Sequence, residues 1–309
     1  MRLFVIYLIF ILVLIQKSIQ KSSEDSIPVI EIRGEGPPMS SAQIRDLEER
    51  SNGKPLDIKI EEIYKPKKCD EKIEVHDWVT FHYKGLTENG KLFDSTFNKE
   101  PVKIQMTTGM SMKGLEKGLM GMCKGQRRKI LIPWRLSRKN KSKVWRLIPN
   151  EEHWMSIEVE IVNIDKWSIE KQFINLDIDN DTFITTDDLS KVAEYLKNFG
   201  KKWSNNDIDN VIAGKYFIKY FDINKDNKVD IKEYILVMQR DLNDMKKANP
   251  IKDKKGNIVG SRREPGFSWI LDHNNDGYVQ PQENYEADKI FEKGTLIRDP
   301  SDIVIKEEL

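Results

Sequence analysis

The sequence is poor in cysteine, with only Cys69 and Cys123 among 309 residues. Two thiols at this spacing form neither a Cys-x-x-Cys motif nor a zinc cluster, so we expect no thiol catalyst and no zinc site. Two is also the smallest number that allows one intramolecular bridge, and in an oxidising compartment the pair is expected to be a disulfide.

The sequence also lacks an excess of charge of one sign and a second long apolar run. It has 51 basic and 50 acidic residues and a formal net charge of +1. No overall field attracts nucleic acid, and we expect none as a partner. The apolar run from Leu3 to Ile15 is too short to span a bilayer comfortably and predicts a signal peptide over residues 1–20. An uncleaved anchor is the alternative, and we expect no membrane association after cleavage.

The two ends of the chain point to the same location. Residues 306–309 read Lys-Glu-Glu-Leu, which is similar to the Lys-Asp-Glu-Leu retrieval signal, within a tail over residues 296–309. Together with a signal peptide, this tail favours the oxidising lumen of the endoplasmic reticulum. Residues 21–54 are rich in Ser, Glu, Gly and Pro and are expected to be a mobile lead-in.

Alternating apolar and polar residues predict a strand-rich domain over residues 55–165. Its segments read as antiparallel strands, with one short helical candidate in MSMKGLEKGLMGM, which indicates an α+β fold. One hairpin is clear, because Phe81 and Tyr83 alternate with polar residues and a turn follows at Glu88-Asn89-Gly90. The strand rules alone leave Asp94 on the returning strand solvated.

From residue 166 the periodicity becomes helical, and three acidic segments repeat one pattern. They begin at Asp177, Asp222 and Asp272, and each has Asp or Asn at positions 1, 3 and 5, a β-branched residue at position 8 and an acid at position 12. A hard cation needs six to eight oxygens, which such a loop supplies. The pattern predicts an all-α EF-hand domain over residues 166–295 with Ca²⁺ as its cofactor.

The second and third loops offer full sets of ligands, whereas the first is the weakest. Thr182 stands at position 6 of the first loop, where a left-handed turn favours Gly, and Asp188 at position 12 is shorter than Glu. An empty loop that only pairs with its neighbour is the alternative. The candidate ligands are Asp177, Asp179, Asp181 and Asp188; Asp222, Asn224, Asp226, the Lys228 carbonyl, Asp230 and Glu233; and Asp272, Asn274, Asp276, the Tyr278 carbonyl, Gln280 and Glu283.

EF-hands pair, and three is an odd number. We expect the first two loops to pair with each other. For the third, the partner is another molecule, the strand-rich domain or a degenerate loop at residues 253–264. That segment lacks acids at positions 3 and 5 and reads as a Gly-Asn turn rather than a metal site.

The segments FHYKGLTENGKLFDST and KGLEKGLMGMCKGQRRKILIP closely resemble the FKBP-type peptidylprolyl isomerases, and the resemblance covers residues 56–165. It implies an antiparallel half-barrel of five or six strands wrapped around a short helix, and a bridge between Cys69 and Cys123. It also implies an apolar pocket that speeds X-Pro rotation by favouring the twisted amide, with no cofactor required for that chemistry. Luminal members with C-terminal EF-hands are the nearest in organisation.

The resemblance also implies a set of pocket residues. Asp94 would orient Tyr83, and the backbone N–H of Ile148 would bind a substrate carbonyl. Aromatic surface is lost, because Leu115 replaces a Trp, Arg138 a Tyr, and Ile157 and Val102 Phe residues, so weak activity is expected. The implied site residues are Tyr83, Phe93, Asp94, Leu115, Ile148 and Ile157.

These features predict a luminal prolyl isomerase that helps proline-containing client polypeptides to fold. The alternatives are a calcium-binding chaperone or scaffold whose FKBP fold is largely non-catalytic, and a calcium buffer. Residues 124–146 hold ten Lys or Arg and no acid, which is either a solvated face or a docking surface for an acidic luminal partner. Trp145 in this segment is left open as a core or a contact residue. An N-x-S sequon predicts glycosylation at Asn140.

Overall fold

The computed structural model describes residues 56–137, 142–149, 154–201 and 210–300, together with Met39, Ile44 and Leu47. The predicted signal peptide, nearly all of the lead-in, the Lys-Glu-Glu-Leu tail, Arg138 and the sequon residue Asn140 lie outside these residues. In the described part of the chain, no helix combines the length and the apolar character needed to cross a membrane.

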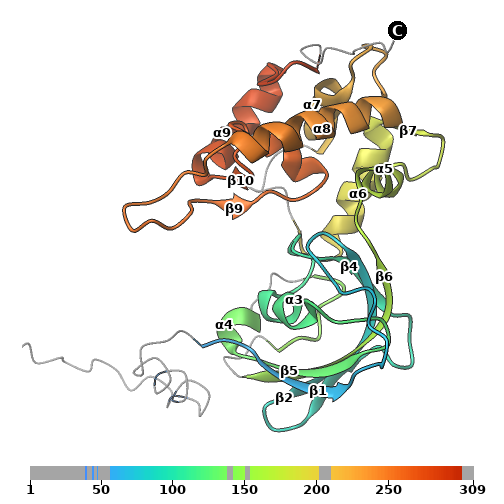
Figure 1. The fold of residues 1–309 in the computed structure, drawn as a ribbon, viewed down its shortest axis with the longest axis vertical. Coiled ribbons are helices and arrows are strands. Elements are labelled where there is room, and N and C mark those ends of the chain that lie inside the picture. Colours follow the sequence, from blue (N-terminus) through green and yellow to red (C-terminus); the bar gives the residue numbers. More distant parts are fainter. Residues whose placement is uncertain are drawn as a thin grey trace, which may run out of the picture. The chain divides into compact units, whose positions relative to one another are not determined.

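A six-stranded antiparallel sheet forms the first half (Figure 1). The strand order is β1-β5-β6-β2-β3, and β4 pairs with β2 beside this path. This sheet confirms the predicted antiparallel arrangement with helices. Its strands are β1 (Lys59–Tyr64), β2 (Trp78–Thr87), β3 (Leu92–Ser95), β4 (Val102–Gln105), β5 (Arg127–Ile132) and β6 (Met155–Asp165).

The short helix α3 (Lys113–Leu119) packs against β5, and two glycines on one face allow the close approach. A Cβ atom on Gly118 would lie 2.4 Å from Cδ1 of Ile130, and one on Gly114 would lie 2.3 Å from Cγ2 of Ile132. Any side chain at either position would push the helix off the sheet. The Gly-x-x-x-Gly spacing is therefore a packing requirement. A further short helix, α4 (Trp134–Ser137), follows β5.

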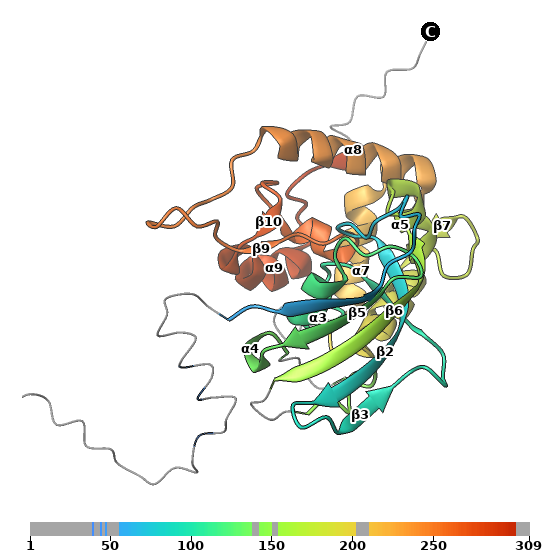
Figure 2. The ribbon, with the colours of Figure 1, turned by 60° about the horizontal axis from the view of Figure 1, so that its bottom comes forward.

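The predicted hairpin is formed by β2 and β3, as Figure 2 shows. Gly90 has a φ of 77°, which a residue without Cβ adopts freely, and Thr87 N–H donates to the Lys91 carbonyl at 2.8 Å. Burial alternates along β2, with Phe81 and Tyr83 facing inward. The period of two in the sequence thus determines which face meets the core.

The predicted disulfide is present between Cys69 and Cys123, whose Cα atoms lie 5.5 Å apart. Cys123 also forms an isolated antiparallel bridge with Lys72. The link fastens the segment that precedes β2 to the turn that follows α3.

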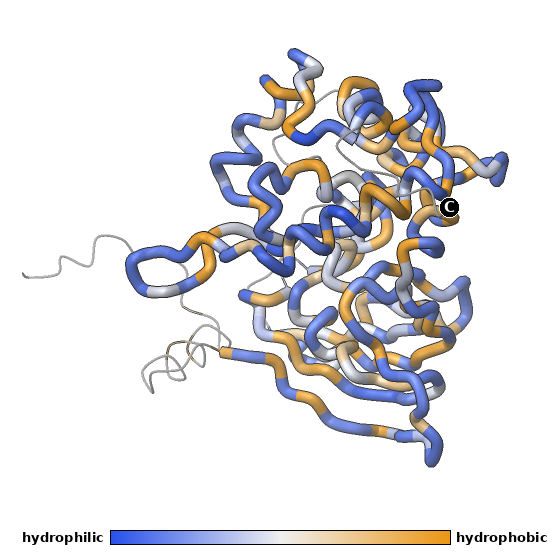
Figure 3. Tube along the Cα trace, turned by 45° about the horizontal axis from the view of Figure 1, so that its top comes forward, coloured by the Kyte–Doolittle hydropathy of each residue, from blue (hydrophilic) through white to orange (hydrophobic). Residues whose placement is uncertain are grey.

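The second half is mainly helical and has its own apolar core, centred on Phe217, Phe221 and Tyr234. Hydrophobic and hydrophilic residues are interspersed along its helices, as expected when each buries one face (Figure 3). Its elements are α5 (Ile169–Leu176), β7 (Phe183–Ile184), α6 (Thr186–Lys197), α7 (Asn210–Phe221), β8 (Val229–Asp230), α8 (Ile231–Lys247), β9 (Ser261–Arg262), η1 (Phe267–Leu271), β10 (Tyr278–Val279) and α9 (Pro281–Lys293). The four short strands form two antiparallel pairs, so this half is not built from helices alone.

Candidate functional sites

Tyr83 and Asp94 lie on neighbouring strands of the hairpin and form a hydrogen-bonded pair. The register opposes Gly85 to Asp94, which brings Asp94 within reach of Tyr83. The Tyr83 hydroxyl donates to Oδ2 of Asp94 at 2.5 Å, and Oδ1 accepts the Ser95 N–H at 2.8 Å. Burial is the main cause that raises the pKa of Tyr83 above its usual value, and the hydrogen bond to Asp94 raises it further. Tyr83 therefore keeps its proton and donates it to Asp94. This is the contact expected from the sequence, although its part in catalysis stays a prediction.

The other predicted pocket residues gather around the same core. Leu115 and Ile157 are buried in the cluster that holds Tyr83, and Phe93 and Ile148 are partly buried against it. The ring of Phe93 lies on Gly85, because a Cβ added there would meet Cζ of Phe93 at 2.3 Å. The structure thus brings the predicted set together around one apolar centre.

Trp145, which the sequence left open as a core or a contact residue, is a neighbour of Tyr83. Its side chain is only 4% exposed, its ring centroid lies 5.5 Å from that of Tyr83, and its Nε1 donates to the Met110 carbonyl at 2.8 Å. The basic segment therefore places an aromatic ring beside the pocket that Leu115 leaves without one. No periodicity surrounds Trp145, so the sequence offered no signal for its position.

The backbone N–H of Ile148, predicted to bind a substrate carbonyl, is used within the chain. It donates to the Trp145 carbonyl at 3.3 Å, a long hydrogen bond. A substrate carbonyl would have to replace this bond, so the predicted role requires an exchange rather than a free donor.

Several cations of the basic segment are paired within the domain. Arg128 donates to the carbonyls of Gly118 at 3.0 Å and Met120 at 3.1 Å, and Lys129 lies 3.7 Å from Glu61. Arg135 donates to the Leu56 carbonyl. Backbone carbonyls and Glu61 thus satisfy part of the run within the domain, which favours the interpretation as a partly solvated face. The acidic partner stays a prediction.

The three acidic loops follow the same backbone path. Position 6 has positive φ in each, with 78° at Thr182, 66° at Asn227 and 88° at Gly277. The N–H of this residue donates to Oδ2 of the position-1 aspartate at 3.0, 2.9 and 2.8 Å, respectively. Thr182 adopts the turn although its β-branched side chain disfavours it. The repeat in the sequence is therefore a repeat in conformation.

The acids at position 12 turn toward their loops in the same way. Glu283 accepts the N–H groups of His273 and Gln280, both at 2.8 Å. Asp188 makes the corresponding contacts with Ile178 at 3.2 Å and with Thr185 at 3.0 Å. The shorter side chain therefore reaches its position.

Carboxylates converge in the first loop. Asp177, Asp179 and Asp188 bring one oxygen each to within 4.8 Å of one another. Oxygen is the ligand atom that hard cations prefer, so these residues fit a calcium ion. The ranking of the first loop as the weakest calcium site stays a prediction.

The short strands decide how the loops pair. Ile184 on β7 pairs with Val229 on β8, which confirms that the first two loops pair with each other. Val279 on β10 pairs with Ser261 on β9, so the third loop pairs with the degenerate segment 253–264. That segment contains the expected turn, with Asp253 N–H donating to the Asn257 carbonyl at 2.8 Å. Of the three alternatives for the third loop, the degenerate loop is correct.

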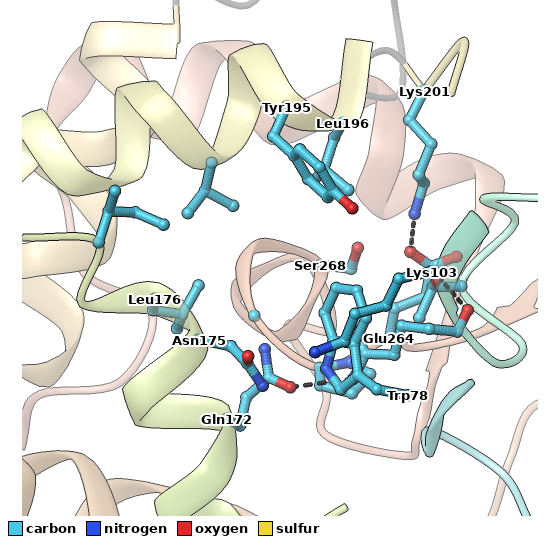
Figure 4. Close-up of a pocket in the computed structure, with 16 residues that line it drawn as sticks. Trp78, Lys103, Gln172, Asn175, Leu176, Tyr195, Leu196, Lys201, Glu264 and Ser268 are labelled. Atoms are coloured by element: carbon cyan, nitrogen blue, oxygen red, sulfur yellow. Dashed lines mark hydrogen bonds and ion pairs between the residues drawn. The ribbon is translucent and has the colours of Figure 1, made fainter. Parts of the chain in front are cut away.

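A cavity of about 250 Å³ lies outside the predicted sites, and Figure 4 shows residues that line it. Its apolar wall includes Trp78, Leu176 and Tyr195. Lys201 and Glu264 form an ion pair at its edge, and Gln105 Nε2 donates to Gln172 Oε1 at 2.9 Å. These polar groups satisfy one another and assign no chemistry to the cavity.

Comparison with known proteins agrees with the pocket geometry. A family model described as FKBP-type peptidyl-prolyl cis-trans isomerase matches residues 69–162. FK506-binding protein 2 of Yarrowia lipolytica is 34% identical over 111 residues, which cover 36% of this chain and 76% of that protein. Peptidyl-prolyl cis-trans isomerase FKBP10 of Homo sapiens is 39% identical over 83 residues, 26% of this chain.

The matches to the larger relatives are partial. The chain spans 14% of the length of human FKBP10 and 58% of Arabidopsis thaliana FKBP15-1, to which it is 35% identical over 88 residues. The Yarrowia protein, in contrast, is matched over most of its length, and residues 69–162, which the family model matches, include the Tyr83–Asp94 pair. The chain therefore belongs to the FKBP-type peptidyl-prolyl cis-trans isomerase family.

Proposed function

We propose that the chain is a peptidylprolyl cis-trans isomerase that acts on proline-containing client polypeptides. The observation that carries the proposal is the hydrogen bond between Tyr83 and Asp94 within an apolar cluster. Family membership supports it, because the relatives are named as isomerases.

The chemistry needs no nucleophile. Rotation about an X-Pro bond is slow because the twisted amide loses resonance, with a barrier of about 18–20 kcal/mol. An apolar, water-poor site favours the less polar twisted amide over the planar one. The side chains of Phe93, Leu115 and Ile157 would supply the apolar surface, and Asp94, which accepts the one proton of the Tyr83 hydroxyl, would fix that hydroxyl in place at the site. Each of these groups binds or orients, and none becomes covalently attached.

We expect Asp94→Val to lower kcat/KM for an X-Pro peptide about 10- to 100-fold, the loss that corresponds to one hydrogen bond to a charged group. Tyr83→Phe removes the other half of the same bond, so the two changes together should cost little more than either alone. Asp165→Val at the end of β6, where the side chain is 43% exposed, is the control and should retain full activity. Equal activity of all these variants would exclude the pair from catalysis.

A calcium-binding chaperone or scaffold with little catalysis is the second candidate. Trp145 favours it, because its ring packs against that of Tyr83, which is only 2% exposed. A prolyl ring would compete with Trp145 for contact with Tyr83, which agrees with the expected weak activity. A folded full-length chain with no isomerisation, in calcium and in chelator, would favour the scaffold.

We further propose that the three acidic loops are EF-hands that bind Ca²⁺. The shared backbone path and the inward-turned acids support this proposal, and the ion would tie each loop together through six to eight oxygens. The residues that would hold it are the predicted ligand sets, with the carbonyls of Lys228 and Tyr278 at position 7.

Calorimetry on the full chain should detect at least two calcium sites with dissociation constants of about 10⁻⁴ to 10⁻³ M, the range of extracellular modules. Glu233→Gln and Glu283→Gln should each remove one site, because each loses its bidentate carboxylate. Glu286→Gln, one turn further along α9, is the control. An unchanged number of sites in both ligand variants would mean that the loops bind no calcium through these acids.

The lumen of the endoplasmic reticulum is the proposed location. The apolar N-terminal run, the Lys-Glu-Glu-Leu end and the Cys69–Cys123 disulfide support it together. Glycosylation at Asn140 would be compatible with this compartment.

A further inference from the structure

A buried arginine packs against the third loop, and it comes from segment 253–264, with which that loop pairs. Arg263 follows β9, is only 3% exposed, and stacks its guanidinium 3.6 Å from the centre of the Trp269 ring. Its backbone N–H donates to the Gly277 carbonyl at 3.0 Å, which joins it to the loop itself. A fully buried cation needs a specific partner.

That partner is the first residue of the loop. Arg263 Nη1 lies 3.1 Å from Oδ2 of Asp272 and donates to Asn275 Oδ1 at 2.6 Å. The side chains of Arg263 and Asp272 are 2% and 0% exposed, respectively, so the ion pair is shielded from water. Among the ion pairs of the described residues, the corresponding Asp177 and Asp222 have no such cation. The third loop differs from the other two in this respect.

The position of Arg263 is held by a second buried group. Trp269 Nε1 donates to Oδ2 of Asp241 at 2.9 Å, and Asn275 Nδ2 donates to the Asp241 carbonyl at 2.9 Å. The ring below Arg263 and the amide beside it are thus both fixed to α8. These bonds hold two of the groups that Arg263 contacts, and the guanidinium would lose its contacts with Trp269, Asn275 and Asp272 if it swung away.

We propose that Arg263 is a built-in counter-cation of the third loop, which holds Asp272 in the metal-free chain and weakens calcium binding there relative to the other loops. The inference rests on the proposed calcium binding. Asp272 would hold the ion through the carboxylate that contacts Arg263, so the ion and the guanidinium would lie close together, where like charges repel even in water. The third loop would therefore fill at higher calcium concentrations.

The test uses the full chain with Asp177→Asn and Asp222→Asn, which leave only the third loop intact. In this background we expect Arg263→Met to lower the calcium dissociation constant by about tenfold. This factor corresponds to the repulsion that water leaves between a divalent ion and a nearby guanidinium. Arg263→Gln removes the charge but keeps a hydrogen-bond donor. It replaces Arg263→Met in the test if the methionine variant does not fold. Arg263→Lys keeps the charge and should stay within about twofold of the parent.

Arg262→Met is the matched control, because Arg262 is the exposed neighbour of Arg263 on β9 and should leave the affinity unchanged. A second measurement is independent of the affinity. In chelator Arg263→Met should melt below the parent, because Asp272 loses its partner, and saturating calcium should narrow this gap since the ion replaces the arginine.

The outcomes separate this inference from the function on which it rests. If the chain with three intact loops takes up no calcium, the proposed calcium binding fails. If it takes up calcium but Arg263→Met and Arg263→Gln bind it no more tightly than the parent, only the role of Arg263 is overturned. An equal melting gap in calcium and in chelator would overturn it as well.

Discussion

Replacing both Cys69 and Cys123 by serine is expected to lower the free energy of unfolding of the strand-rich half by about 4 kcal/mol. The bridge joins residues 54 positions apart, so it removes much of the freedom of the unfolded chain. It also fixes Lys72 beside Cys123, at the turn after α3. Because a domain is stable by only about 5–15 kcal/mol, this change removes a large part of its stability.

Denaturant unfolding of the double-serine variant, followed by tryptophan fluorescence, measures this loss. A reducing agent should destabilise the native chain by a similar amount and leave the variant unaffected, which provides the matched control. Two free thiols in the protein isolated from the secretory pathway would contradict the disulfide, and a variant as stable as the parent would contradict the energetic argument.

Asp241→Asn is expected to destabilise the helical half by about 3 kcal/mol or more, because it removes the charge from a buried ion-pair network. The Asp241 carboxylate is fully buried and accepts hydrogen bonds from Tyr220 Oη at 2.7 Å and Trp269 Nε1 at 2.9 Å. Arg240 Nε at 2.9 Å and Arg298 Nη1 at 3.2 Å complete the set. An amide at this position would direct its NH₂ group toward at least one of these donors.

Asp244→Asn is the control for this prediction, since Asp244 lies three residues further along α8 and is partly exposed. Thermal melts in chelator isolate the effect from any calcium binding. A melting temperature equal to that of the parent would show that the network tolerates a neutral group, and it would also weaken the argument that Asp241 fixes Trp269 beneath Arg263.

Local patterns in the sequence were sufficient for the elements and for most of the predicted sites. The alternation along β2 and the turn at Gly90 predict the hairpin, because a period of two permits one register with the apolar face buried. Those strand rules left Asp94 solvated, and its contact with Tyr83 was implied only by the resemblance to the isomerases. The three acidic loops are predicted from spacing in the same way, since all the ligands of one loop lie within twelve consecutive residues.

Contacts between distant segments are less accessible to such reasoning. Trp145 lies 62 positions from Tyr83 in the sequence, within a basic run that has no periodicity, and only the packing of the core selects it. The pairing of the third loop was open for a similar reason. The degenerate segment lacks ligands, and its two-residue strand depends on backbone hydrogen bonds, which leave little trace in side-chain type.

Residues close together in the chain were sufficient to predict the hairpin and the repeat of acidic loops, and the motifs that resemble the isomerases added the contact between Asp94 and Tyr83. The folding of distant segments was needed to show that Trp145 packs against Tyr83, that the third loop pairs with segment 253–264, and that Arg263 faces Asp272. These depend on which surfaces meet when the core closes. Burial then gives each contact its strength, because an ion pair or ring contact shielded from water is far less screened than the same groups on the surface.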